Sequence, residues 1–96
     1  MIFATLNYDG NYDSQHRQLH RTLSMKFEDV QEGLQCDSWI RIRKNDEEVT
    51  VDSFTSMKHE VKARDKHSQL VNEVIDTLKA SYDVTVHTPP IVELHE

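Results

Sequence analysis

Apolar residues alternate with polar ones at the start of the chain, "MIFATLNY", and a turn-forming segment, "YDGNYD", follows. Ile2, Ala4 and Leu6 fall on one side of such a segment, and a period of two is typical of a strand with one buried face. We therefore predict a strand over 1–8, followed by a turn at the Asp9-Gly10 pair.

The pattern then changes to a helical period. Five apolar residues recur at steps of four, four, three and four: Leu19, Leu23, Phe27, Val30 and Leu34. This spacing predicts one amphipathic helix over 14–32. Asp13 or Ser14 would supply the N-cap oxygen, and Gly33 stands where a C-terminal cap belongs.

The segments "DSWIRIR" and "EEVTVDSF" carry the clearest hairpin signal, because both alternate and "KNDE" lies between them. A tight turn at Asn45-Asp46 fixes the register. The predicted cross-strand pairs are Ile42 with Val49, Ile40 with Val51, Arg43 with Glu48, Arg41 with Thr50 and Trp39 with Asp52. A slip of one residue would separate the apolar pairs, so the pattern specifies this register.

Residues 55–64 fit either a further strand, with Met57, Val61 and Ala63 on one face, or the start of a helix. We favour the strand, because the turn-rich "DSFTS" precedes it and a new helix start follows it.

A second helix is predicted over 66–81, with Asp65 or Ser68 as its cap. Its apolar stripe comprises Leu70, Val71, Val74, Ile75 and Leu78. Val84 and Val86 then indicate a last strand. Pro89 and Pro90 should end this strand, because proline cannot donate to a strand ladder. Residues 89–96 are expected to form a loosely ordered tail, with a short edge strand over 91–96 as the alternative.

The order β-α-β-β-(β)-α-β predicts one α+β domain over 1–96. We expect a two-layer sandwich, with a mainly antiparallel sheet of four or five strands and two helices on one face. A ferredoxin-like or related arrangement fits this order.

Charge and composition restrict the function. The chain has 11 Lys and Arg against 17 Asp and Glu, which argues against non-specific nucleic-acid binding. The basic segment 57–67 carries Lys58, Lys62, Arg64 and Lys66, and it keeps a nucleic-acid module as the alternative. No apolar run approaches the ~20 residues of a membrane span, so no membrane association is expected. A single cysteine fits the reducing cytoplasm.

The sequence gives only weak support to three candidate reactive sites. Asp9, Asn11 and Asp13 alternate as in a calcium loop, but positions six and twelve of that loop would be Ser14 and His20 instead of Gly and Glu. His16 and His20 have a zinc-compatible spacing, although two solvated helix-face histidines are the favoured interpretation. Cys36 precedes Asp37, whose charge opposes thiolate formation.

A metal- or thiol-dependent enzyme is thus only a second alternative. Gly10 and Gly33 are the only glycines, which excludes the P-loop and Rossmann fingerprints. We expect no enzyme activity and no cofactor.

The second face of the hairpin is the favoured functional surface. It would present Trp39, Arg41, Arg43 and Phe54 on the open side of the sheet, and these residue types are enriched in binding hot spots. We predict a small cytoplasmic binding or accessory module whose partner is another protein or a second copy of the chain. In the competing interpretation, Trp39 packs over its neighbours or is covered by the C-terminal tail.

Overall fold

The computed structural model describes residues 1–54 and 57–93, which form six strands and two helices. In chain order the elements are β1 Ile2–Asn7, α1 Tyr12–Lys26, β2 Asp29–Leu34, β3 Ser38–Lys44, β4 Glu47–Asp52, β5 Glu60–Lys62, α2 Gln69–Lys79 and β6 Asp83–Ile91.

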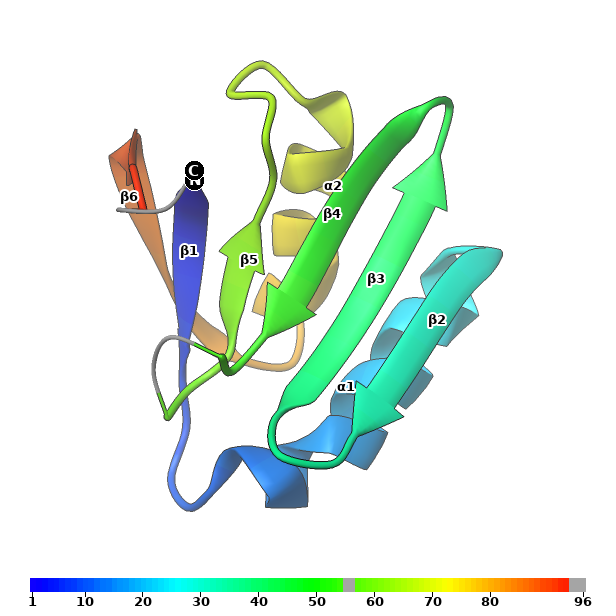
Figure 1. Cartoon of the computed structure of the whole chain (residues 1–96), viewed down its shortest axis with the longest axis vertical. Helices are drawn as coiled ribbons and strands as arrows, with labels where there is room; N and C mark the ends of the chain where they lie inside the picture. The colour runs from blue at the N-terminus through cyan, green and yellow to red at the C-terminus, as the bar shows by residue number, and fades with distance from the viewer. Residues whose placement is uncertain (55–56, 94–96) are drawn as a thin grey trace.

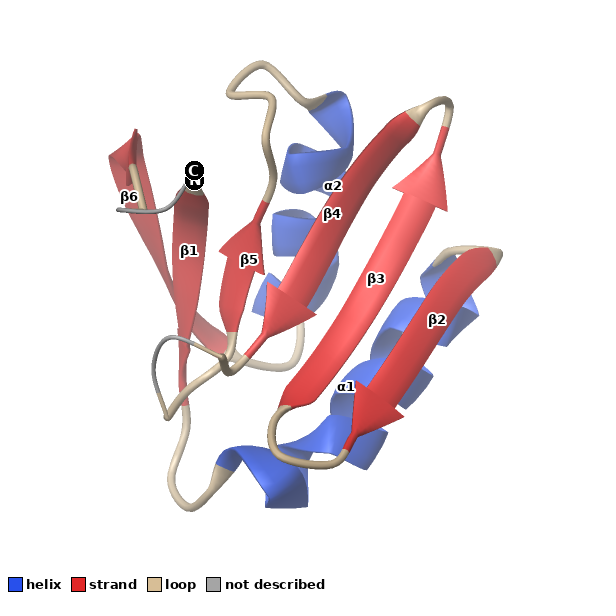
Figure 2. Cartoon of the chain, viewed as in Figure 1, coloured by secondary structure: helices blue, strands red, loops and turns tan. Residues whose placement is uncertain are grey.

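The strands form one open sheet in the order β2-β3-β4-β5-β1-β6, and every neighbouring pair is antiparallel. Both helices cover the same face, which lies behind the sheet in Figure 1, and the other face is open (Figure 2). The predicted α+β two-layer sandwich is confirmed. The sheet has six strands where four or five were expected, and this longer order does not confirm the ferredoxin-like arrangement.

The predicted hairpin is confirmed in all its pairs. β3 and β4 pair Ile40 with Val51 and Trp39 with Asp52, in the register that the alternation indicates. The turn residues Asn45 and Asp46 have positive φ angles of 54° and 65°. Two successive positive φ angles match the right-handed twist of a hairpin, and Asn and Asp tolerate them better than other side chains.

The predicted helix over 14–32 is wrong at its C-terminal end. α1 stops at Lys26, Phe27 has an extended backbone, and Asp29–Leu34 form the edge strand β2. A step of four keeps two residues on one side of a strand as well as of a helix. The positions of Val30 and Leu34 therefore did not distinguish a continued helix from a strand. Continuing the helix would have placed the acidic residues 28, 29 and 32 at its negative end.

The start of α1 also differs from the prediction. The N-cap is Asn11, whose side chain makes no capping hydrogen bond, and Asp13 and Ser14 lie inside the first turn. The hydroxyl of Ser14 donates to the carbonyl of Asn11 at 2.7 Å.

The second helix is confirmed, within the shorter bounds of α2. Ser68 is its N-cap and accepts a hydrogen bond from the backbone of Val71 at 3.3 Å. The predicted stripe is entirely buried: Leu70, Val71, Val74, Ile75 and Leu78. These residues pack with Leu19 and Leu23 of α1 against the apolar face of the sheet, where Ala4 and Leu6 are buried as predicted. Phe3 takes the place predicted for Ile2 in this core, because the register of β1 shifts between Ile2 and Ala4.

Residues 60–62 form a strand, as favoured over a helix, and Val61 and Ala63 are buried. Met57 is not on that face, because it lies in the loop before β5 with 67% of its side chain exposed. Residues 55–56 lie outside the described residues.

The prolines do not end the last strand. β6 continues through Pro89 and Pro90 to Ile91, which pairs with Ile2. The strand tolerates them because β6 is an edge strand, with only β1 as a neighbour, so its outer side has no ladder to interrupt. Of the predicted tail, residues 89–93 are therefore ordered against the sheet, and residues 94–96 lie outside the described part of the chain.

Candidate functional site

Trp39, Arg41 and Arg43 lie on the open face of the sheet, where the alternation of β3 placed them. Trp39 is half-buried because it lies over Gly33 of the paired strand β2. A Cβ atom at Gly33 would come within 2.3 Å of the indole Nε1 and 2.4 Å of Cε2. The glycine therefore leaves room for the indole on the backbone of β2. The competing interpretation, in which Trp39 packs over a neighbour, holds for the ring face that lies on Gly33.

The two arginines of β3 differ in their partners. Arg43 donates from Nε to Oε1 of Glu48 at 2.8 Å, and this carboxylate raises the pKa of Arg43. Arg41 lies over the Trp39 ring, 5.3 Å from its centroid, and its Nε is 3.9 Å from the same oxygen of Glu48. That Nε is buried and has no hydrogen-bond acceptor among the described residues.

Phe54 does not lie on β4. It follows the strand by two residues, its backbone N–H donates to Asp52 Oδ1 at 3.2 Å, and 75% of the side chain is exposed. The structure brings Trp39, Arg41 and Arg43 together on one strand, whereas Phe54 lies on the adjoining loop. The predicted set is therefore a three-residue patch with a separate exposed ring beside it.

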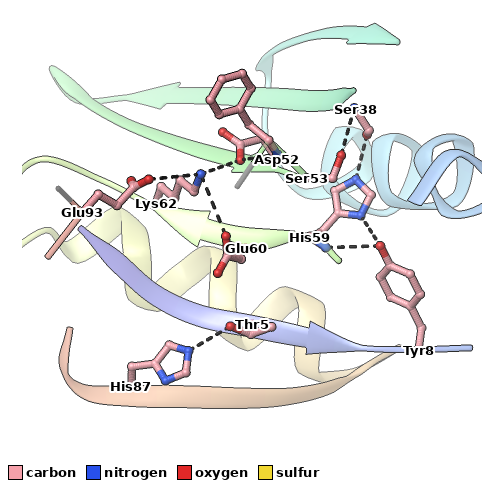
Figure 3. Close-up of polar contacts among 11 residues, drawn as sticks. Thr5, Tyr8, Ser38, Asp52, Ser53, His59, Glu60, Lys62, His87 and Glu93 are labelled. Atoms are coloured by element: carbon pink, nitrogen blue, oxygen red, sulfur yellow. Dashed lines mark hydrogen bonds and ion pairs between the residues drawn. The ribbon is translucent and has the colours of Figure 1, made fainter. Parts of the chain in front are cut away.

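A buried ionic cluster occupies the middle of the same face (Figure 3). Lys62 of β5 contacts Asp52 of β4 at 2.8 Å, Glu93 at 3.6 Å and Glu60 at 4.0 Å. Glu93 follows β6, so its side chain joins the cluster from the opposite side of β1. The cluster thus involves β4, β5 and the residue two positions after β6, whereas Trp39 lies on the neighbouring strand β3.

The basic segment 57–67 is not one continuous patch. Lys58 donates to the carbonyl oxygens of Tyr8 and Gly10, and Lys62 belongs to the buried ionic cluster. Arg64 and Lys66 are the members that the structure leaves exposed. Two exposed cations give less support to the nucleic-acid alternative than the sequence did.

The helix-covered face carries a feature that the sequence did not predict, a chain of hydrogen bonds that runs through the buried side chains of His16, Ser38 and His59. Ser38, at the start of β3, stands at its centre, and Figure 3 shows the side that runs from Ser38 through His59 to Tyr8. Its hydroxyl is 2.5 Å from Nδ1 of His16 and 2.7 Å from Nε2 of His59. On one side the chain continues from His59 Nδ1 to the hydroxyl of Tyr8 at 2.8 Å.

On the other side the chain reaches the edge of the sheet. His16 Nε2 is 2.8 Å from Oε1 of Glu32 on β2, and His20 Nε2 is 2.8 Å from Oε2 of the same carboxylate. We call the connected set Tyr8, His59, Ser38, His16 and Glu32 the histidine–serine network. Ser38 and His59 have no exposed surface, and His16 is 5% exposed.

The environment of His59 opposes a positive charge. Burial, and then the proximity of His16, lower the pKa of His59 from 6.5 to about 4. Burial also raises the pKa of Tyr8. Both groups are therefore neutral at neutral pH, which suits a network without free charge in its centre.

Two sequence-based interpretations of the histidines need correction. His16 is not a solvated helix-face residue, and His20 binds a carboxylate rather than only water. His16 lies three residues before Leu19, so it extends the buried stripe of α1 by one step, and that spacing was the available signal. No comparable signal marked Ser38 or His59, because their contact depends on three segments far apart in the sequence.

The network has the order hydroxyl, imidazole, carboxylate that nucleophilic hydrolases use. Its serine differs in two respects from a nucleophile. Ser38 is completely buried, and a second imidazole holds the other side of its hydroxyl. Within residues 1–54 and 57–93, no group of three or more His, Cys, Asp or Glu has the geometry to hold a metal ion.

Residues 8–11 form the turn between β1 and α1, as favoured over a calcium loop. Gly10 has a φ of +88°, and the ammonium of Lys58 fills the space between the carbonyls of the turn and the Tyr8 ring, 4.6 Å from the ring centroid. A resident lysine charge at these oxygens disfavours a second cation.

Comparisons of the chain with protein-family models, with curated proteins and with solved structures find no match. Neither helix in the described part of the chain is long and apolar enough to cross a membrane. Fold and geometry therefore define the class, a two-layer α+β protein with one open sheet face.

Proposed function

We propose that the protein is a binding module whose open sheet face receives an acidic segment of a partner protein at Trp39 and Arg41. The observation that carries the proposal is the state of Arg41. Its guanidinium lies over the Trp39 ring, and 37% of its side chain is exposed. Its Nε is buried without an acceptor among the described residues, so the exposed N–H groups of the guanidinium are the donors that a partner's carboxylate can reach in a charge-assisted hydrogen bond.

The surroundings favour a short acidic–apolar segment over a polyanion. The half-buried indole of Trp39 and the exposed ring of Phe54 offer apolar contact beside the guanidinium. Glu48 and Asp52 lie on the same face, and a nucleic acid would bring many phosphates close to them. One carboxylate seated on Arg41 meets less repulsion.

Selection of peptides from a random display library on the immobilised protein tests this proposal. We expect enriched peptides to carry Asp or Glu next to Leu, Phe or Trp. A synthetic enriched peptide should bind at least tenfold more weakly to Arg41→Gln and to Trp39→Ala, with both variants folded by circular dichroism. Arg64→Gln, an exposed arginine away from the patch, is the matched control and should bind normally.

Three outcomes would overturn the proposal: no enrichment, enrichment of basic peptides, or an affinity that Arg41→Gln leaves unchanged. Oligo(dT) binding at low salt that Arg64→Gln abolishes would support the nucleic-acid alternative instead. A concentration-dependent dimer that Trp39→Ala dissociates would assign the face to a second copy of the chain.

A further inference from the structure

We propose that the histidine–serine network is a proton switch. It holds the Trp39 indole against Gly33 on the open face and releases the indole when acid protonates both histidines. The position of the network relative to the tryptophan is the first observation. Glu32 precedes Gly33, on whose backbone the indole lies, and Ser38 precedes Trp39 itself. Neighbouring residues of a strand point to opposite faces, so the network lies directly behind the Trp39 seat.

The hydrogen-bond directions follow from one fixed end. The carboxylate of Glu32 only accepts, so Nε2 of His16 donates to it, and a neutral His16 then accepts at Nδ1. Ser38 must donate its single hydrogen to that Nδ1 and must accept from Nε2 of His59.

His59 in turn accepts at Nδ1 from the Tyr8 hydroxyl. The Tyr8 oxygen also accepts from the backbone N–H of His59 at 3.2 Å. Every buried atom of the network is satisfied in this neutral form.

One added proton reverses the network without breaking it. A protonated His16 donates from both nitrogens, so Ser38 accepts from it and donates to His59, which then donates to Tyr8. A second added proton cannot be accommodated by reversing the hydrogen bonds. Both imidazolium rings would direct an N–H at the one buried oxygen of Ser38, and two like charges would share a water-free site.

The charged and titratable groups around the two rings come from every packed element. Glu32 faces His16 from β2, and His20 shares that carboxylate from α1. At the other end, Lys58 and Tyr82 contact the Tyr8 ring, the latter with centroids 6.3 Å apart. Among the described residues, the carboxylate in contact with the two rings is Glu32, on the far side of His16, so a cationic His59 would have no carboxylate beside it. The low pKa of His59 agrees with this geometry.

Loss of the network would act on Ser38 first, because a protonated His16 still donates to the carboxylate of Glu32, whereas two protonated rings conflict at the Ser38 hydroxyl. Ser38 immediately precedes Trp39 on β3. Displacement of Ser38 therefore moves the indole off the Gly33 backbone on which it lies. The link to binding rests on the proposed function, whereas the switch itself does not.

The chain has one tryptophan, so its fluorescence reports directly on the contact between the indole and Gly33. We expect the emission of Trp39 to shift to longer wavelength between about pH 6.5 and 4, before the far-UV circular dichroism changes. His59→Gln and His16→Gln should abolish this transition or displace its midpoint by about one pH unit or more. His67→Gln, at an exposed histidine outside the network, should leave it unchanged.

A measurement on the native chain keeps the test independent of how the variants fold. Nitrogen-15 spectra of the histidine rings at neutral pH should show a proton on Nε2 and none on Nδ1 for both His16 and His59. A proton on Nδ1 of His59 would overturn the assigned direction. Emission that stays constant until global unfolding, or that His67→Gln alters as much as His59→Gln, would overturn the switch.

The library-selected peptide separates the two proposals. Binding at pH 7 that weakens at least fivefold at pH 5, and less than twofold in His59→Gln, supports the switch acting on the binding face. Equal affinity at both pH values with constant emission overturns the switch and leaves the binding function standing. An acid shift in emission with no selected peptide retains the switch and overturns the binding function.

Discussion

The two faces of the sheet bury polar groups in opposite ways. The open face holds an ionic cluster, with one lysine, Lys62, between three carboxylates. The helix-covered face holds the histidine–serine network, in which His59 and Tyr8 are neutral at neutral pH. Asp52 and Glu93 of the cluster keep 15% and 24% of their side-chain surface exposed, so water partly screens the cluster, whereas Ser38 and His59 at the centre of the network have no exposed surface.

The depth of burial decides whether an ion pair or a chain of neutral hydrogen-bonded groups costs less free energy. Charges near water keep part of their hydration, so an ion pair there costs little and contributes little. Deep burial makes an ion expensive, and a chain of neutral donors and acceptors avoids that cost only while each member is satisfied. The network should therefore be sensitive to the loss of one atom or the gain of one proton, and the ionic cluster should be more tolerant.

The largest expected effect is that of removing the central hydroxyl. Ser38→Ala leaves ring nitrogens of His16 and His59 without a partner in the core, and we expect it to lower the free energy of unfolding by about 3 kcal/mol. Urea denaturation at pH 7 measures this. Ser53→Ala is the matched control, because it removes one hydrogen bond, to the Ser38 backbone, and should cost about 1 kcal/mol. Equal losses in the two variants would contradict the central role of Ser38.

Acid should weaken the fold through His59. Its pKa is lower in the folded chain than the usual 6.5, so between about pH 6.5 and 4 the unfolded chain binds more protons. The stabilisation from neutral His59 is complete above pH 6.5 and is lost as the pH falls. A pKa difference of about 2.5 corresponds to about 3 kcal/mol as an upper bound.

Denaturation of the native chain and of His59→Gln at pH 7 and pH 4 checks this loss. The difference in stability between the two pH values should be smaller in the variant by most of that amount. The same pH dependence in both proteins would show that other groups cause it.

Breaking the ionic cluster should cost less than breaking the network. Lys62→Met removes the cation that lies between three carboxylates, of which Asp52 and Glu93 keep part of their surface exposed, so we expect a loss of about 2 kcal/mol. Lys44→Met removes the exposed ion pair with Glu73 and should change stability by less than about 0.5 kcal/mol. A larger effect of Lys62→Met than of Ser38→Ala would reverse the comparison.

The smallest expected effect concerns the seat of the tryptophan. Gly33→Ala places a methyl group where the Trp39 indole lies, and the displaced ring should cost about 1 kcal/mol. The emission of Trp39 at pH 7 should then resemble that of the native chain at acid pH. Gln31→Ala, on the same strand, is the control and should leave the spectrum unchanged.

Much of the fold follows from patterns within short segments. The alternation around Asn45-Asp46 determines the register of the hairpin, because one face must be apolar and the turn residues must accept positive φ. The stripe of α2 predicts its buried face in the same way. These features depend on neighbours in the sequence, so they also place Trp39, Arg41 and Arg43 on one face of β3.

Other features depend on contacts that no local pattern encodes. Whether residues 29–34 continue the helix or pair with β3 is decided by the free edge of the hairpin, since Val30 and Leu34 fit both. Pro89 and Pro90 remain in a strand because β6 lies at an edge. The histidine–serine network is the clearest case: the tertiary structure alone decided it, because Tyr8, Ser38 and His59 meet only after β1, β3 and β5 have taken their places in the sheet.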